Sequence, residues 1–387
     1  MQELRVRLET VTPLFLGGEE PRQDPELRAS SFRGALRYWL RAALAGAVGD
    51  DDRGVQKVWA AESAVFGSAG EGQSGIGDKR AGASAVVVRV RGQMPDPLPY
   101  QKSNPGWDPI TRRPIPSGRD YLFWSMAKTS ADAARSYWPP GTSFELALAA
   151  RPGAADGEAA LDQAIAALWL LVHLGGIGAR SRRTGGSMGV PNAVEANGLR
   201  FALAGTTPGA LAGELREGLG QVRSLFRALG NQAPAAVPSE FDVLHPRCCR
   251  VWVLGLWPST NQAMEEIGTA LQRFRGPRGR GPQDRVRRRE SGIGLLERAV
   301  FGLPIKGVDA KEGGSQVDRR ASPLWLKVSK TVKGNYAGIA TLFSSRFLPE
   351  RAFLQASGRR ADPPADYGLL EGFVREYFAA AQEVRYE

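Results

Sequence analysis

Residues 30–44 read SSFRGALRYWLRAAL, and their apolar side chains recur every three or four positions. This spacing predicts an amphipathic helix with one face in the protein core. We expect Ser30 or Ser31 to cap the start of the helix, and Gly46 and Gly49 to end it.

The segments on either side of this helix predict the β-α-β-β-α-β order of a ferredoxin-like fold. Residues 3–9 alternate polar and apolar side chains, which is typical of a half-buried strand. The remaining elements of the first unit are expected at residues 84–90, 143–150, 161–174 and near 189–203. The same order recurs with strands at 250–257, 324–328 and 336–343, helices at 261–274 and 367–378, and a short closing strand.

We therefore predict an α+β protein of tandem ferredoxin-like (RRM-like, βαββαβ) domains. The N-terminal domain is expected over residues 1–205 and the C-terminal domain over residues 206–387, with a helix near 211–229. Two long insertions interrupt this plan. Residues 94–142 are rich in aromatic side chains with basic residues among them, and residues 273–289 hold eight arginines against one acid. Gly and Pro between these arginines predict a flexible basic loop.

The charge balance points to a polyanionic partner. The chain has 51 basic and 40 acidic residues, a formal net charge of +11, and 42 of the basic residues are arginine. Such a balance favours nucleic acid first and a membrane surface second. Arginine makes bidentate contacts to phosphate, although GC-rich coding also converts lysine to arginine without any function.

Cysteine content and hydropathy indicate a soluble, cytoplasmic chain. The two cysteines, Cys248 and Cys249, are adjacent and cannot join distant segments, which indicates a reducing compartment. The longest strictly apolar run, residues 164–172, is too short to span a membrane, so we expect no membrane partner. The first residues resemble a strand rather than a signal peptide.

Three arginines of the first helix, Arg33, Arg37 and Arg41, follow one another at four-residue spacing. They form a row beside the apolar stripe, and Arg28 lies just upstream. No acid lies in this row, so the arginines repel one another unless a phosphate backbone runs along them. The alternative is a solvated face whose aliphatic stems cover apolar surface.

A Gly-rich loop, GGIGARSRRTGGS at residues 175–187, follows the second helix. Glycines allow close approach of phosphate, and successive N–H groups form an anion nest. The loop is neither a Walker loop, since no Gly-Lys-Ser/Thr ends it, nor a dinucleotide fingerprint, since it follows a helix. An ordinary turn with glycine caps is the alternative. The RNA-binding residues expected in this loop are Gly176, Gly178, Arg180, Ser181, Arg182, Arg183 and Gly186.

The sequence contains no arrangement of residues that is typical of a catalytic site. His173 lies in an apolar helix, where a core histidine is the simpler interpretation, and His245 precedes a proline in a linker. No spacing of His or Cys suits a metal, and the run at 50–52 is expected to be a solvated acidic turn. We therefore expect no catalytic residue, no metal and no cofactor.

Two motifs together resemble a known family. The segment TPLFLGG…ELRASSFRGALRYWLRAAL (12–44) and the Gly-rich loop are similar to the RAMP superfamily of CRISPR proteins. Within that superfamily they resemble the first subunit of the type III-B (Cmr) effector complex. The stretch RRASPL (319–324) also resembles RAMP sequences of this complex.

The resemblance implies a non-catalytic, RNA-binding subunit of a ribonucleoprotein in antiviral defence, located near the crRNA 3′ end. It implies crRNA and single-stranded target RNA as ligands, and the sixth Cmr subunit and the backbone subunits as partners. Ser31, Arg33, Arg37 and Arg41 match positions at which such proteins hold RNA, and Arg28 extends that row. The insertion at 94–142 matches the place where related subunits extend a thumb.

Three alternatives remain open at this point. The chain could be a metal-independent crRNA-processing endoribonuclease of the same superfamily, the sixth Cmr subunit, or a free-standing RNA chaperone. Charge alone adds Arg285, Arg287, Arg288 and Arg289 as RNA-binding candidates. We also expect the first helix and the Gly-rich loop to form one site. Arg33 and Arg37 would lie on one side of that site, and the loop arginines on the other.

Overall fold

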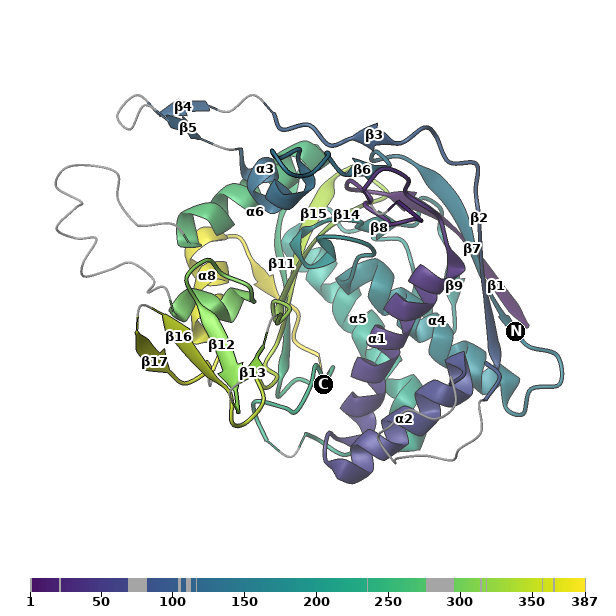
Figure 1. Cartoon of the computed structure of the whole chain (residues 1–387). Helices are drawn as coiled ribbons and strands as arrows, with labels where there is room; N and C mark the ends of the chain where they lie inside the picture. The colour runs from purple at the N-terminus through teal and green to yellow at the C-terminus, as the bar shows by residue number, and fades with distance from the viewer. Residues whose placement is uncertain are drawn as a thin grey trace.

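The N-terminal half of the protein contains an antiparallel four-stranded sheet (Figure 1). The structure is a computed structural model and describes residues 2–386 apart from 21, 69–81, 104–105, 109–112, 116, 235, 276–295, 314, 318, 357 and 365. The strands are β1 (Glu3–Thr10), β2 (Val86–Arg91), β7 (Ser143–Ala150) and β8 (Met188–Gly189). They lie in the order β2-β7-β1-β8, and in β1 buried residues alternate with more exposed ones, as the sequence predicts.

A second antiparallel sheet has the same strand order in the C-terminal half. Its strands are β11 (Cys249–Trp257), β14 (Leu324–Lys330), β15 (Tyr336–Phe343) and β18 (Gln382–Glu383), in the order β14-β15-β11-β18. Counted by appearance along the chain, both sheets therefore run 2-3-1-4. The protein is a mixed α+β structure with several antiparallel sheets.

Helices cover the second sheet on both faces. Three of them lie between the two sheets in Figure 1: α1 (Ala29–Val48), α4 (Gly157–Leu174) and α5 (Pro208–Phe226). Two others, α6 (Thr260–Arg275) and α8 (Gly368–Tyr377), pack on the opposite face. Because both faces are covered, β14 and β15 are buried along most of their length, and their burial does not alternate as it does in β1.

One further helix of 15 residues and several shorter elements complete the fold. The helical ones are α2 (Asp52–Phe66), α3 (Gly118–Leu122), η1 (Trp124–Met126), η2 (Ser181–Arg183), η3 (Arg227–Leu229) and η4 (Glu297–Phe301). The two-stranded pairs are β3 (Leu98–Pro99) with β6 (Ser136–Tyr137), β4 (Gly106–Asp108) with β5 (Arg113–Ile115), and β9 (Glu195–Ala196) with β10 (Leu199–Arg200). A third four-stranded sheet contains β12 (Asp309–Glu312), β13 (Ser315–Gln316), β16 (Phe353–Ala356) and β17 (Arg359–Ala361).

Several sequence-based expectations about the N-terminal half are wrong in detail. Helix α1 begins after Arg28, without a side-chain cap from Ser30 or Ser31, and Gly46 lies inside it. The strand expected near 189–203 is only the two residues of β8, followed by the β9–β10 hairpin. The acidic run at 50–52 is not a solvated turn, because Asp51 caps α2 and Asp50 is buried. Helix α2 itself was not expected.

The aromatic insertion is docked against the C-terminal half through α3. Glu265 of α6 accepts hydrogen bonds from the N–H groups of Gly118 (2.7 Å) and Arg119 (3.1 Å), at the start of α3. Gly118 and Gly268 let the two helices touch, since a Cβ on either would clash with main-chain atoms of the other helix. Most aromatic side chains described in this insertion therefore fill core, while Trp124 stays 63% exposed.

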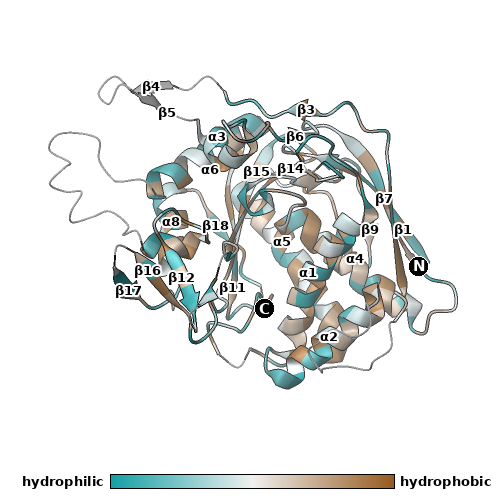
Figure 2. Ribbon diagram, viewed as in Figure 1, coloured by the Kyte–Doolittle hydropathy of each residue, from teal (hydrophilic) through white to brown (hydrophobic). Residues whose placement is uncertain are grey.

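Helix α4 is long and apolar enough to cross a membrane. The strictly apolar run at 164–172, which is only half as long as the helix, did not indicate this. Figure 2 shows it apolar along most of its length. In the folded chain, however, it lies between the two sheets and most of it is buried. Its apolar surface is explained by this packing inside the protein core.

Candidate nucleic-acid interface

The Gly-rich loop folds back on the TPLF segment at residues 12–15. Gly186 donates its N–H to Pro13 O (2.8 Å), and Ala179 donates to Phe15 O (2.8 Å). Gly178 and Gly186 have positive φ angles of 81° and 59°. A Cβ at Gly178 would clash with the main chain of Phe15, so only glycine fits this close approach. The two sequence motifs are therefore parts of one structural unit.

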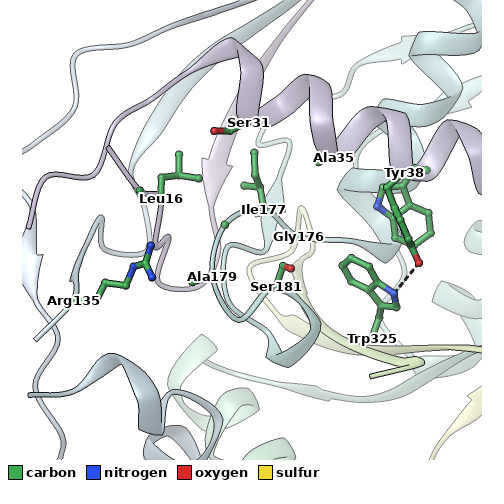
Figure 3. A pocket seen from close by; sticks show the side chains of 13 residues that line it. Leu16, Ser31, Ala35, Tyr38, Arg135, Gly176, Ile177, Ala179, Ser181 and Trp325 are labelled. Atoms are coloured by element: carbon green, nitrogen blue, oxygen red, sulfur yellow. Dashed lines mark hydrogen bonds between the residues drawn. The ribbon is translucent and has the colours of Figure 1, made fainter. Parts of the chain in front are cut away.

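A cavity of about 490 Å³ opens where α1, this loop and the insertion meet. Figure 3 shows Arg135 at one end of the cavity, and Tyr38 and Trp325 at the other. The lining residues are Leu16, Gly17, Ser31, Ala35, Tyr38, Trp39, Arg135, Gly176, Ile177, Gly178, Ala179, Ser181 and Trp325. The first helix and the Gly-rich loop, which the sequence predicts to form one site, thus line one cavity. That this cavity binds RNA stays a prediction.

The helix face that lines the cavity is not the face that carries the arginine row. Ser31, Ala35 and Tyr38 line the cavity, whereas Arg37 and Arg41 lie on the side of α1 that packs against α2. Arg37 Nη1 lies 3.1 Å from Glu62 Oε1, and Arg41 Nη1 lies 3.4 Å from Glu62 Oε2. The predicted pairing of this row with the loop arginines across one groove is wrong.

Arg37 is held further by main-chain carbonyls at the end of α2. It donates to Phe66 O (2.8 Å) and to Gly67 O. Arg33 is partly buried, and its Nε has no hydrogen-bond partner among the described residues. Arg28 is exposed and donates to Gly17 O (2.7 Å), at the rim of the cavity.

Replacing Glu62 with glutamine should lower the free energy of unfolding by about 1–2 kcal/mol, because Arg37 and Arg41 would lose their shared carboxylate. Urea denaturation measures the change. Glu217→Gln is the control, since its ion pair with Arg200 is exposed at both ends and should be worth less than about 0.5 kcal/mol. Equal effects in both variants would show that Glu62 does not join α1 to α2.

The arginines of the Gly-rich loop point into the protein. Arg183 is 6% exposed and donates to Phe301 O (2.9 Å) and Leu324 O (3.3 Å), and burial holds its pKa well below the usual value. Arg180 Nε donates to Leu122 O (2.6 Å), and burial lowers the pKa of Arg180 to about 10. These guanidinium groups join the loop to β14, η4 and the insertion.

Arg182 belongs to a buried network centred on Asp242. Asp242 Oδ2 accepts from Tyr38 Oη (2.6 Å) and Arg182 Nη2 (3.3 Å), and Oδ1 accepts from Ser345 Oγ (2.6 Å). The Arg182 guanidinium lies 4.4 Å from the ring centre of Trp325 and also donates to Ser322 O. Burial and the Asp242 carboxylate raise the pKa of Tyr38, so its phenol stays protonated. The network fixes the two rings at one end of the cavity.

Hydrogen-bond donors without partners surround the cavity. Helix α1 has no side-chain cap and no acid in its first turn, so its positive N-terminal end suits an anion, although the N–H of Ser31 itself donates to Arg28 O (3.1 Å). Among the described residues, no hydrogen bond is found for the N–H groups of Gly176 and Gly178. Arg135 Nε and Trp39 Nε1 are also buried without a partner in this part of the chain. The arrangement suits a phosphate at the Arg135 end.

Sequence reasoning missed Arg135 and Asp242, because each is an isolated charge in a segment without a motif. Arg285, Arg287, Arg288 and Arg289 lie outside the described residues. The basic loop that contains them leaves from the end of α6, where Arg275 influences the pKa values of Arg180 and Arg183. Its start is therefore close to the Gly-rich loop.

Neither histidine is placed for acid–base chemistry. His173 is buried against Trp169 with ring centres 4.5 Å apart, as expected, and burial lowers its pKa to about 3. Burial also lowers the pKa of His245, to about 4. Within the described ranges, no cluster of three or more His, Cys, Asp or Glu side chains could hold a metal ion.

Comparisons with known proteins agree with this architecture. The model of the RAMP superfamily matches residues 7–188. The chain is 28% identical over 353 residues to the CRISPR system Cmr subunit Cmr1-1 of Pyrococcus furiosus, covering 89% of this chain and 88% of the relative. The crystal structure of apo Cmr1 from Pyrococcus furiosus has the same fold, with a TM-score of 0.60, 22% identity, and coverage of 100% of this chain and 99% of that one. A chain of the type III-B Cmr-beta complex bound to cognate target RNA gives a TM-score of 0.50 at 13% identity, covering 98% and 100%.

Proposed function

We propose a function for this chain from the premise that it is a RAMP superfamily protein homologous to the Cmr1 subunits of type III-B CRISPR complexes. In this proposal the chain is a subunit of a type III-B effector complex. It binds single-stranded RNA, either the crRNA or the target RNA, near the 3′ end of the crRNA. The observation that carries the RNA-binding role is the cavity between α1 and the Gly-rich loop, with its unpaired N–H and guanidinium donors.

The overall charge supports the same role. A net charge of +11 favours a polyanionic partner, and the eight arginines at 273–289 would add sequence-independent affinity for RNA. We infer that the protein's partners are the sixth Cmr subunit and the backbone subunits, in the cytoplasm. A chain of similar fold lies in a Cmr complex bound to target RNA, which supports the assignment of this protein to such a complex.

We infer that the two halves are copies of one ferredoxin-like unit, over residues 1–205 and 206–387. The shared 2-3-1-4 strand order of the two sheets supports the duplication. Helix α5 would open the second unit, and it packs against α1, α4 and β11, so the two units share one core. Such a core would hold the Gly-rich loop rigidly between the units.

We assign no catalytic step to this chain. Metal-independent RNA cleavage in related enzymes needs a general acid or base, and the low pKa values of both histidines do not suit that task near neutral pH. Incubation of the full chain with repeat RNA in EDTA tests this assignment. Cleavage at a defined site would favour the endoribonuclease alternative.

Replacing Arg135 with alanine should weaken binding of single-stranded RNA several-fold and reduce the slope of log K against log salt by about 0.7. The reason is the loss of one phosphate contact at the cavity. Fluorescence anisotropy across a salt series measures both quantities. Arg5→Ala, on the exposed side of β1, is the control and should leave affinity nearly unchanged. Equal behaviour of the two variants would place the RNA elsewhere.

A further inference from the structure

We propose that the cavity receives one nucleobase of the bound RNA, at the end formed by Tyr38 and Trp325. This inference rests on the proposed RNA-binding function and specifies what the cavity itself holds. A phosphate alone needs donors at a surface, whereas this site continues inward to aromatic side chains. The volume of about 490 Å³ lies within the range of about 300–1,000 Å³ typical of pockets that hold small molecules and cofactors.

The wall at the inner end is aromatic and rigid. The ring centres of Tyr38 and Trp325 are 5.2 Å apart, and those of Trp39 and Trp325 are 5.4 Å apart. Trp325 Nε1 donates to Tyr38 Oη (3.1 Å), which in turn donates to Asp242, so both rings are fixed before any ligand arrives. Aromatic surfaces accept any base, because every base has a π-face.

One polar group on this wall lacks a partner. Trp39 is fully buried, yet its indole N–H makes no hydrogen bond to any described residue. Gly175 leaves room for the indole, since a Cβ there would clash with Nε1. An unpaired buried donor is costly, and acceptors on the edge of a nucleobase would satisfy it. The hydroxyl groups of Ser31 and Ser181 line the same cavity and can donate or accept.

The two ends of the cavity match the two parts of a nucleotide. Arg135 and the rings lie at opposite ends in Figure 3, with the Gly-rich loop between them. A backbone phosphate held by Arg135 and the start of α1 would therefore place its base toward Tyr38 and Trp325. Base contacts of this kind are sequence-tolerant, so the pocket would add affinity without selecting a sequence.

The test fills the cavity without changing charge. Ala35→Trp should weaken binding of a mixed-sequence, single-stranded oligoribonucleotide to the full chain by about tenfold, the typical value of one stacked base. An oligomer with the same backbone but no bases should bind wild type and Ala35→Trp alike. The control, Ala60→Trp, adds the same bulk to an exposed position on α2. A 2-aminopurine in the RNA should be quenched by wild type and by Ala60→Trp, but not by Ala35→Trp.

A second variant guards against misfolding of the first. Trp39→Phe removes the indole N–H and keeps a ring, so it should weaken RNA binding several-fold while circular dichroism stays native. If RNA binds but both cavity variants behave like Ala60→Trp, the base pocket is wrong and the proposed function stands. If wild type binds no RNA, the proposed function itself fails.

Discussion

Asp242→Ala is expected to lower the free energy of unfolding by about 3–5 kcal/mol, measured by urea or guanidinium denaturation at neutral pH. The carboxylate is only 9% exposed, and it is the acceptor for Arg182, Tyr38 and Ser345. Its removal leaves a largely buried guanidinium without a countercharge and two hydroxyl groups without their acceptor. The Arg182 guanidinium, although packed on Trp325, cannot reach water freely to recover that loss.

The matched control is Glu240→Ala, two residues earlier in the same segment. Glu240 pairs with Arg346 at 2.6 Å, but both side chains are more than one-third exposed. Pairs of this kind contribute about 0–1 kcal/mol. If Asp242→Ala cost no more than Glu240→Ala, the buried network would not be what joins α1, the Gly-rich loop and the second sheet.

The main elements of the fold could be predicted because their signals are local. In β1, buried and more exposed residues alternate along one strand, and in α1 the three- and four-residue spacing identifies the buried face without knowledge of its partner. The order of these elements then predicted the sheets. The small sheet at 309–361 was missed because its strands have two to four residues and polar segments such as DAKE.

The site was predictable in position but not in chemistry. Spacing places Arg33, Arg37 and Arg41 on one face of α1, but it cannot say what covers that face. The cover is α2, whose Glu62 lies more than twenty residues away, and no local pattern links the two. In the same way, the main-chain carbonyls that receive Arg183 come from segments more than a hundred residues distant. The arginines of the Gly-rich loop therefore indicated an RNA-binding surface. In the structure, these arginines hold the loop to the C-terminal half instead.

Lys327→Met should stabilise the protein at low pH and lose most of that advantage at high pH. Lys327 lies in β14 and is 1% exposed. Its ammonium donates to Met188 O (3.0 Å), and no carboxylate among the described residues pairs with it. Burial lowers its pKa from 10.5 to about 7. His173, the neighbouring titratable group in α4, is neutral near pH 7 because burial lowers its own pKa to about 3, so it supplies no opposing charge.

The sign of the pH effect follows from proton binding. Between pH 7 and 10.5 the unfolded chain binds a proton at Lys327 that the folded chain has lost, so wild type gains stability as pH rises through this window. The gain is up to about 1.4 kcal/mol per pH unit. Methionine cannot titrate and has a similar volume. We therefore expect Lys327→Met to be about 3 kcal/mol more stable than wild type at pH 6, after subtracting the hydrogen bond to Met188.

Denaturation of both proteins at pH 6 and pH 9 measures this difference, which should shrink by about 2–3 kcal/mol at the higher pH. Lys330→Met, in the same strand, is the control. Lys330 is partly exposed and its pKa is raised by the hydrogen bond to Glu9 (2.8 Å), so its stabilisation is present at both pH values. That variant should be slightly less stable than wild type at pH 6 and at pH 9. A pH-independent difference for Lys327→Met would mean that the Lys327 ammonium stays charged in the folded protein, held by Met188 and by water that reaches it between the two sheets.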